Sequence, residues 1–566
     1  MVATVADILA STLKHHGVKR IFGQSVPTAL LLRTPSFGIE QVAYRTENAG
    51  GAMADGYARV SGRVGIVTAQ NGPGAALLVA PFAEALKASS PVVGLVQDVA
   101  RPSVDRNAFQ ELDHIELYKS CTKWVRRLTD PRRAAEYLDM AVVAATSGRP
   151  GPTVLLLPID LLEEEAGSVQ TGRSGLGSYP LDRPQADGQL VAEAASLLAA
   201  AKRPIVVAGG GVHLSGAAAE VTVLQERFHL PIATTTMGKG SVDEQVDLSI
   251  GVIGYFMGTF SRSHYMRSIV DSADVILMVG SRTNQNGTDG WKLFPRDARF
   301  IHVDVDPVEV GRNYESLRLV GDARSTLRAL IRELGTRDVA PLAAWGDECA
   351  KLVREAKRRN AAESLSVVES EVVPIRPERV MAELDRLLPN QAIVVADASY
   401  STIWAANYLT SRRPGQRFIT PRGLAGLGWG LPMGLGAKVA SPEVPVVVVS
   451  GDGGFGHCWS EMETAVRSRI PIVHIVLNNS VLGYQQHGEL VNWGAHTSAV
   501  RFAPVDHAKI AEACGARATR VERPGQLRSA LESALGQAEP YLVDVVVSAG
   551  AYPPITAFEG KVPDRT

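Results

Sequence analysis

Short runs of aliphatic and β-branched residues recur along the whole chain. The runs are continuous rather than alternating, and stretches rich in Ala, Leu and Glu separate them. This pattern is typical of buried parallel strands joined by crossover helices, so it predicts an α/β fold with doubly wound parallel sheets. The predicted strands cover residues 64–69, 91–96, 153–158, 204–209, 274–280, 299–306, 392–397, 445–451, 471–479 and 541–547.

Two segments interrupt this pattern and indicate domain boundaries. Residues 163–188 mix acidic residues with Gly, Ser and Pro and have no periodicity, as expected of a linker. Residues 335–377 begin as a loop, continue as a highly charged helix and end near two prolines. The chain is therefore expected to form three α/β domains and a tail, at 1–165, 188–335, 375–548 and 549–566.

Composition and charge narrow the class of protein. Of 566 residues, 45% are hydrophobic and 21% charged, and 58 Lys and Arg against 59 Asp and Glu give a formal net charge of −1. This balance argues against a basic nucleic-acid-binding surface. The four cysteines never form a C-x-x-C pair, and no apolar run approaches the ~18 residues that cross a bilayer. We expect a cytoplasmic protein that binds neither nucleic acid nor membrane.

The strongest chemical signal lies in the third predicted domain. One apolar strand ends in Gly-Asp-Gly-Gly, with Asp452, and a second ends in Asn478 and Asn479. Parallel strands finish at the same edge, so Asp452 and Asn479 are expected to converge there as hard oxygen ligands for Mg²⁺. The glycines at 453 and 454 let backbone N–H groups approach an anion. A Mg²⁺-bridged diphosphate fits both features; an ordinary strand–turn–helix is the alternative.

Residues 451–479 resemble the signature of thiamine-diphosphate-dependent enzymes over their whole length. The order of the three domains resembles the branch that contains acetolactate synthase, oxalyl-CoA decarboxylase and 2-hydroxyacyl-CoA lyase. The resemblance implies thiamine diphosphate and Mg²⁺ in 375–548, with Asp452, Asn479 and the Val481 backbone oxygen as metal ligands. The other cofactor contacts expected in this region are Gly453, Gly454, Leu482, Gly483 and Tyr484.

The same resemblance assigns a glutamate, Glu47, to the first domain, where it would bind the cofactor's pyrimidine ring. A carboxyl group on N1′ favours the imino tautomer, whose N4′ removes the thiazolium C2 proton. In the family this glutamate comes from a neighbouring subunit, which implies a homodimer or homotetramer with active sites at the interface. A helix N-terminal glutamate without a catalytic role is the alternative for Glu47.

Two further segments resemble cofactor-contacting positions of the family. In the glycine-rich segment 423–432, the Ala425 carbonyl would accept from N4′ and the Leu427 side chain would hold the two rings in a bent conformation. Tyr400 and Ser401 match positions that contact the diphosphate. The alternatives are a dinucleotide-binding loop for 423–432 and an ordinary βα turn for the Tyr400–Ser401 pair.

The central domain has a possible nucleotide site of its own. A strand precedes Gly209-Gly210-Gly211, and Asp304 ends another strand, where it could bind a ribose diol. In the acetolactate synthase branch this domain holds FAD, and in the acyl-CoA branch it holds ADP. A purely structural domain is the remaining alternative. The candidate nucleotide contacts are Gly210, Gly211, Arg282, Asp304 and Asp322.

The residues expected on the substrate side of the cofactor distinguish the acetolactate synthase branch from the acyl-CoA branch. Gln110, in the loop 108–111, would hydrogen-bond a substrate oxygen, and Glu489 is a candidate for handling a hydroxyl proton, although it could be a surface residue. Gly488 stands where acetolactate synthases have a Trp, and residues 282–289 replace their flavin-side motif. These departures favour the acyl-CoA branch, in which a C-terminal segment such as 549–566 closes over CoA.

The small-molecule substrate is therefore expected to be an acyl-CoA or a 2-oxo acid. We expect first a carbon–carbon lyase that converts 2-hydroxyacyl-CoA into a ketone or aldehyde and formyl-CoA. The alternative is an acetolactate-synthase-like carboligase acting on pyruvate or another 2-oxo acid. A flavin-dependent oxidoreductase resembling pyruvate oxidase is a further alternative, and Glu47 with the Mg²⁺ motif argues against a non-catalytic scaffold.

Overall fold

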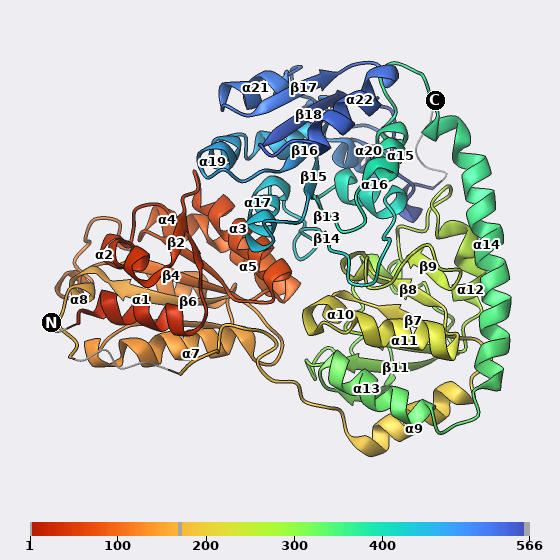
Figure 1. Ribbon diagram of the computed structural model, residues 1–566, viewed down its shortest axis with the longest axis horizontal. Coiled ribbons are helices and arrows are strands. Elements are labelled where there is room, and N and C mark those ends of the chain that lie inside the picture. Colours follow the sequence, from red (N-terminus) through yellow and green to blue (C-terminus); the bar gives the residue numbers. More distant parts are fainter. Residues whose placement is uncertain (1–2, 168–172, 560–566) are drawn as a thin grey trace.

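Three parallel sheets form the framework of the protein. The computed structural model describes residues 3–167 and 173–559, and every strand pair within its three six-stranded sheets is parallel. Figure 1 shows the first unit in red and orange, the central unit in yellow and green, and the third in blue. The predicted α/β class is confirmed.

The first sheet has the order β2-β1-β3-β4-β6-β5. Its strands are β1 (Arg20–Phe22), β2 (Glu40–Val42), β3 (Gly65–Ala69), β4 (Val92–Asp98), β5 (Trp124–Arg127) and β6 (Thr153–Pro158). Its helices are α1 (Val5–His15), α2 (Thr28–Arg33), α3 (Glu47–Ser61), α4 (Pro73–Leu77), α5 (Val79–Ala88), α6 (His114–Lys119), α7 (Ala134–Thr146) and α8 (Ile159–Leu162).

The central sheet has the order β12-β11-β10-β7-β8-β9, which is the 3-2-1-4-5-6 order of dinucleotide-binding folds read in reverse. Its strands are β7 (Pro204–Ala208), β8 (Ile232–Thr234), β9 (Ser249–Val252), β10 (Val275–Val279), β11 (Arg299–Asp304) and β12 (Ser316–Val320). Its helices are α9 (Gly188–Ala199), α10 (Gly210–Ser215), α11 (Ala218–Phe228), α12 (Arg267–Asp271) and α13 (Ala323–Leu334).

The third sheet repeats the topology of the first, with the order β14-β13-β15-β16-β18-β17. Its strands are β13 (Ile393–Ala396), β14 (Phe418–Ile419), β15 (Val446–Gly451), β16 (Val473–Asn478), β17 (Arg517–Val521) and β18 (Tyr541–Val546). Its helices are α15 (Pro377–Leu387), α16 (Tyr400–Tyr408), α17 (Gly430–Ala440), α18 (Asp452–Gly456), α19 (Glu461–Arg467), α20 (Gly483–Trp493), α21 (His507–Ala513) and α22 (Pro524–Leu535).

All ten apolar runs are strands of these sheets, but the structure has eight further strands that the pattern did not reveal. The missed strands are either three residues or shorter, or carry Gly or Arg among their apolar residues, so they lack a continuous apolar run. They are β1, β2, β5, β8, β9, β12, β14 and β17. The strands of each sheet fall inside one predicted domain range, while the exact domain boundaries stay a prediction.

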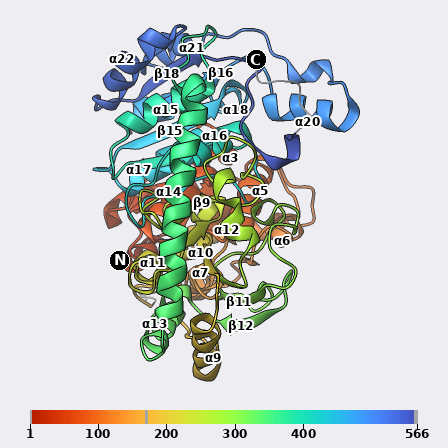
Figure 2. The same cartoon turned by 90° about the vertical axis from the view of Figure 1, so that its right-hand side faces the viewer.

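A long helix and the C-terminal segment join the units. Helix α14 (Ala340–Val368) packs on the central unit, where the Trp345 indole donates to the Pro204 carbonyl at 3.0 Å, and leads to the third unit (Figure 2). Within the predicted tail, Ile555 and Phe558 are buried. Residues 560–566 of that tail lie outside the described residues. No helix in the described ranges has both the length and the apolar character needed to cross a bilayer.

Helices α3 and α17 cross at very short range and hold the first unit against the third. A Cβ on Gly56 would overlap the Met433 carbonyl oxygen, and one on Gly436 would overlap the Met53 carbonyl oxygen. Neither glycine has a left-handed backbone. Glycine is therefore needed at these two positions for the close approach of the helices and not for its conformational freedom. Met53 and Met433 are fully buried at the same crossing, so the helices cannot separate without opening the core.

We expect Gly436→Ala to destabilise the protein by about 1–3 kcal/mol, because the added methyl group forces α3 and α17 apart. The change would appear as a lower apparent melting midpoint in differential scanning fluorimetry. Gly525→Ala is the matched control, since a Cβ on Gly525 in α22 meets no neighbouring atom. An equal midpoint for the two variants would contradict the role of the crossing.

Candidate active site

A cavity of about 520 Å³ lies at the carboxyl edge of the third sheet. It sits where the strand order reverses between β13 and β15, the position at which open α/β sheets bind ligands. The structure brings ten of the predicted cofactor contacts together in its walls. They are Tyr400, Ser401, Leu427, Asp452, Gly453, Gly454, Asn479, Val481, Leu482 and Gly483.

Asp452 and Asn479 hold the ends of β15 and β16 together. The Asp452 carboxylate accepts from the Ser480 amide at 2.5 Å and from the Gly453 amide at 3.0 Å, while the Asn479 side-chain oxygen accepts from the Val481 amide at 3.1 Å. Burial raises the pKa of Asp452 to about 6, although these hydrogen bonds oppose the rise. The raised pKa means that burial disfavours the charged form of this carboxylate, and a cation beside it would stabilise that form.

The chemistry of this donor set suits a metal that is shared with a phosphate ligand. Within the described parts of the chain, no group of three or more His, Cys, Asp or Glu side chains could hold a metal alone. One carboxylate, one amide oxygen and one backbone oxygen leave coordination positions for ligand oxygens, as Mg²⁺ prefers. Glycine is needed beside them, because a Cβ on Gly454 would overlap the Asp397 carboxylate.

Asp397, which the sequence analysis did not identify, fixes the glycine-rich loop beside the cavity. Its carboxylate accepts from the backbone amides of Gly428, Trp429 and Gly430 at 3.0, 3.2 and 3.1 Å. Burial raises the pKa of Asp397, and the three donors oppose that effect. The anchored loop presents Leu427 to the cavity, with Ala425 at φ +62°. The position of Asp397 directly after the apolar strand β13 is the sequence feature that could have identified this residue.

Tyr400 forms one wall of the cavity together with α20. Its hydroxyl is 2.6 Å from Nδ1 of His487, and its ring lies 5.8 Å from the Tyr484 ring. Burial lowers the pKa of His487 to about 4, so the ring is neutral near pH 7 and can accept from the hydroxyl. Tyr484 lies behind the cavity lining, where its ring is 5.5 Å from Phe558 of the C-terminal segment.

Glu47 and Gln110 lie at the corresponding edge of the first sheet, outside the cavity. Glu47 is the first residue of α3, where a Cβ on Gly74 would be 3.0 Å from its Oε1. Gln110 has φ +60°, and its Oε1 lies 3.5 Å from Nε2 of Gln70. Phe109 beside it is 86% exposed. Neither Glu47 nor Gln110 lines the cavity of the same chain, and the catalytic roles of both stay predictions.

Glu489 is not part of the cavity lining. Its Oε2 accepts from the Thr497 amide at 2.6 Å, so the carboxylate ties the last turns of α20 to the segment that follows. The catalytic role assigned to Glu489 stays a prediction.

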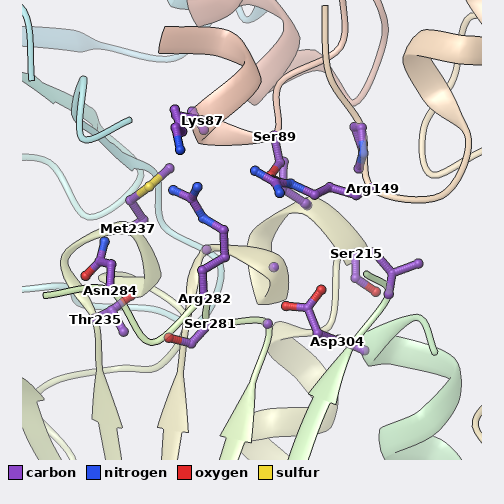
Figure 3. Close-up of a pocket in the computed structure, with 18 of the residues that line it drawn as sticks. Lys87, Ser89, Arg149, Ser215, Thr235, Met237, Ser281, Arg282, Asn284 and Asp304 are labelled. Atoms are coloured by element: carbon purple, nitrogen blue, oxygen red, sulfur yellow. Dashed lines mark hydrogen bonds between the residues drawn. The ribbon is translucent and has the colours of Figure 1, made fainter. Parts of the chain in front are cut away.

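A larger pocket, of about 1100 Å³, lies at the switch point of the central sheet between β7 and β10 (Figure 3). All five predicted nucleotide contacts line it, namely Gly210, Gly211, Arg282, Asp304 and Asp322. The first unit adds Lys87, Ser89 and Arg149, and the third adds Arg422. These residues could not be predicted from the sequence, because their place in the pocket depends on how the units pack.

The charges of this pocket favour an anionic ligand. The charge of Arg149 is compensated by two carboxylates, because its Nη1 lies 3.3 Å from Oδ2 of Asp306 and 3.3 Å from Oε1 of Glu309. Lys87, Arg282 and Arg422 form no ion pair within residues 3–167 and 173–559. Burial and the nearby Arg149 charge lower the pKa of Arg282, so an anion between these cations would stabilise them.

Comparison with known proteins assigns each unit to one family. Residues 3–117 match the thiamine pyrophosphate enzyme N-terminal TPP binding domain, residues 191–330 the central domain, and residues 397–545 the C-terminal TPP binding domain.

Three relatives that align with nearly the whole chain are named as acetolactate synthases. The chain is 31% identical to a probable acetolactate synthase large subunit of Methanocaldococcus jannaschii, over 98% of this chain and 94% of that protein. It is 31% identical to the acetolactate synthase isozyme 3 large subunit of Escherichia coli, over 97% and 95% of the two chains. Acetolactate synthase 1 of Oryza sativa is also 31% identical, over 96% of this chain and 84% of its own length.

We expect Asp397→Ala to weaken thiamine diphosphate binding by at least about tenfold, because three buried amides of the loop lose their acceptor. Titration by isothermal calorimetry in the presence of Mg²⁺ would measure the effect. Asp397→Asn, which keeps one acceptor oxygen, should lose less. The exposed Asp182→Ala variant is the control, and unchanged affinity in Asp397→Ala would show that the loop does not depend on this carboxylate.

Proposed function

This chain belongs to the thiamine-diphosphate-dependent enzymes that make or break carbon–carbon bonds, and from that premise we propose that it is an acetolactate-synthase-like carboligase. It would join a 2-oxo acid such as pyruvate to a second 2-oxo acid with loss of one CO₂. The observation that carries the proposal is similarity to acetolactate synthases over nearly the whole chain. The 2-hydroxyacyl-CoA lyase interpretation has no such support.

The residues of the cavity fit the cofactor. Asp452, Asn479 and the Val481 carbonyl would bind Mg²⁺, and the amides of Gly453 and Gly454 would face the diphosphate. When bound, thiamine diphosphate supplies a carbon that adds to a carbonyl and accepts the electrons left by departing CO₂. Leu427 packs at the cavity wall and the preceding loop would orient the two rings.

We propose that Glu47 of a partner subunit completes each site. The Glu47 carboxyl group would hold a proton at N1′ of the pyrimidine ring, and it does not line the cavity of its own chain. Gln110, on the same edge, would donate its amide N–H to a substrate carbonyl oxygen. The exposed apolar side chains of Phe109 and Leu77 on the first unit, 86% and 49% exposed, support a contact with a second copy.

The central pocket would hold an adenine nucleotide, either FAD or ADP. Lys87 and Arg282 would bind its phosphates, and Asp304 lies at the end of β11, where it could accept from ribose hydroxyls. Burial raises the pKa of Asp304 to about 6. This value is still below 7, so the ionised carboxylate is the main form near pH 7 and can accept hydrogen bonds from both hydroxyls.

We expect Glu47→Gln and Asp452→Asn each to lower acetolactate formation from pyruvate by at least about 100-fold. Co-expression of the two variants, each with its own tag, gives heterodimers in which one site combines a wild-type Glu47 with a wild-type Asp452. Heterodimers purified through both tags should recover about half of the wild-type activity. No recovery would contradict a site shared between subunits.

The control for this pair is Glu116→Gln on α6, because that side chain lies on the surface.

Pyruvate and a short 2-hydroxyacyl-CoA would be offered in parallel. Formyl-CoA from the thioester, without acetolactate from pyruvate, would overturn the carboligase proposal in favour of the lyase. Oxidation of pyruvate by a bound flavin would favour the pyruvate-oxidase-like alternative.

We expect ADP or FAD to bind the central pocket, and Arg282→Gln to weaken that binding by about tenfold, because a charge-assisted bond to phosphate is lost. Calorimetric titration with ADP and the absorption spectrum of the purified protein would measure the two ligands. A protein that binds neither would make the central unit structural.

A further inference from the structure

A further cavity, of about 440 Å³, lies where the three units of the chain meet. The first unit contributes Arg59 to its wall, the central unit His213, and the third unit the segment 417–420. We call it the junction cavity. Ala88, Gly210, Leu214 and Met237 line both this cavity and the central pocket, so the two are neighbours. The polar side chains described below line only the junction cavity.

Arg417 brings an uncompensated charge to the junction cavity. Its half-buried guanidinium forms no ion pair and no hydrogen bond within residues 3–167 and 173–559. Burial lowers the pKa of Arg417, and of the described groups only the Tyr179 hydroxyl opposes this effect. A guanidinium that is removed from water without a counter-charge would be stabilised by an anion beside it.

The other cations around the junction cavity already have carboxylate partners. Arg59 lies 2.6 Å from Asp55 and 3.2 Å from Glu84. The Lys239 ammonium lies 2.7 Å from Glu244. Because these carboxylates are held by other cations, the five N–H donors of the remaining guanidinium are left for a ligand.

Two neutral side chains add further polar groups to the wall. Thr420 is only 6% exposed, and its hydroxyl has no hydrogen-bond partner among the described residues. Nε2 of His213 lies 2.9 Å from the Lys239 carbonyl oxygen, which can only accept, so Nε2 carries the proton. Burial lowers the pKa of His213 to about 3, so the ring stays neutral near pH 7 and Nδ1 keeps its lone pair.

This set of groups suits a small oxyanion that also carries a proton. A guanidinium binds two oxygens of an oxyanion through parallel hydrogen bonds, and a hydroxyl can donate to a third oxygen. The Nδ1 lone pair needs a donor from the ligand. Hydrogen phosphate has such an O–H group near pH 7, whereas sulfate has none and would place an oxygen lone pair against the nitrogen.

We propose that the junction cavity binds hydrogen phosphate, which Arg417 and Thr420 hold and His213 selects. The ion would lie apart from the nucleotide proposed for the central pocket, and it would stabilise the packing of the three units because each of them contributes to the wall. The inference does not depend on the carboligase reaction.

Calorimetric titration with inorganic phosphate tests the site. The protein is first loaded with thiamine diphosphate and Mg²⁺, which keeps phosphate out of the cofactor cavity, and the titration is run with and without ADP. Arg417→Gln should weaken phosphate binding by at least about tenfold, and Thr420→Val by about threefold. Arg413→Gln, an exposed arginine of the same loop, is the control and should bind phosphate as wild type does.

Melting midpoints separate a ligand-binding arginine from a structural one. In phosphate-free buffer, Arg417→Gln should melt no lower than wild type, because the substitution removes a charge without a partner. Saturating phosphate should raise the wild-type midpoint on the order of 2 °C above that in chloride of equal ionic strength, and should leave the variant unchanged. A lower midpoint for the variant in phosphate-free buffer would assign Arg417 a structural role and overturn the proposal.

Sulfate tests the part assigned to His213. Wild type should bind sulfate at least about tenfold more weakly than phosphate, because sulfate offers no proton to Nδ1. His213→Gln keeps an N–H donor for the Lys239 carbonyl and removes the Nδ1 acceptor, so it should bring the two affinities within about threefold of each other. Equal affinities in wild type would overturn the selection of phosphate.

Three other results would overturn the site itself. They are the absence of saturable phosphate binding in wild type, an unchanged phosphate affinity in Arg417→Gln, and a phosphate affinity that falls as ADP is added. The last result, or a loss in Arg282→Gln in place of Arg417→Gln, would place the phosphate in the central pocket.

Discussion

The close crossing of α3 and α17 determines where each half of the candidate site lies. With glycine at both contact points, the backbones of the two helices touch, and the first unit is held rigidly against the third. Glu461 adds to this by accepting from the Arg45 and Thr46 amides at 3.1 Å each, directly before Glu47. Glu47 is thereby fixed outside the cavity of its own chain. A second copy of the chain is the natural source of the missing carboxyl group under the proposed function.

Buried charge connects the sites to one another. Glu84, fully buried on α5, pairs with Arg59 at 3.2 Å and accepts from the amides of Gly423 and Leu424 at 2.8 and 2.6 Å. The same helix ends at Ala88, and its last two residues line the central pocket together with the C-cap Ser89. Glu84 thus connects α5 directly to the loop that carries Arg422 and Leu427. Removing either partner of the Glu84–Arg59 pair would leave an uncompensated buried charge and destabilise this connection.

The sequence predicted the parts of the structure that depend on local patterns. Ten continuous apolar runs became strands, and the residues around Asp452 and Asn479 met in one cavity because parallel strands end at the same edge. Strands as short as Phe418–Ile419 left no such pattern. Lys87, Arg149 and Arg422 could not be assigned to the central pocket, since they come from other units and reach it only through packing. The Glu489 carboxylate accepts from the Thr497 amide, and its catalytic role stays a prediction.

The first and third sheets share one strand order, and under the proposed function their equivalent edges would have opposite electrostatic tasks. The edge of the third sheet gathers Asp452 and Asn479, oxygen ligands that suit a bound cation, and a carboxylate beside a cation stays ionised. The edge of the first sheet carries Glu47, whose proposed role needs a proton that it can hold and release. A carboxyl group cannot do both at once, because a cation strong enough to bind a diphosphate would strip the proton. Under the proposed function, placing the two carboxyl groups on separate sheets would keep the proton-handling group away from the metal.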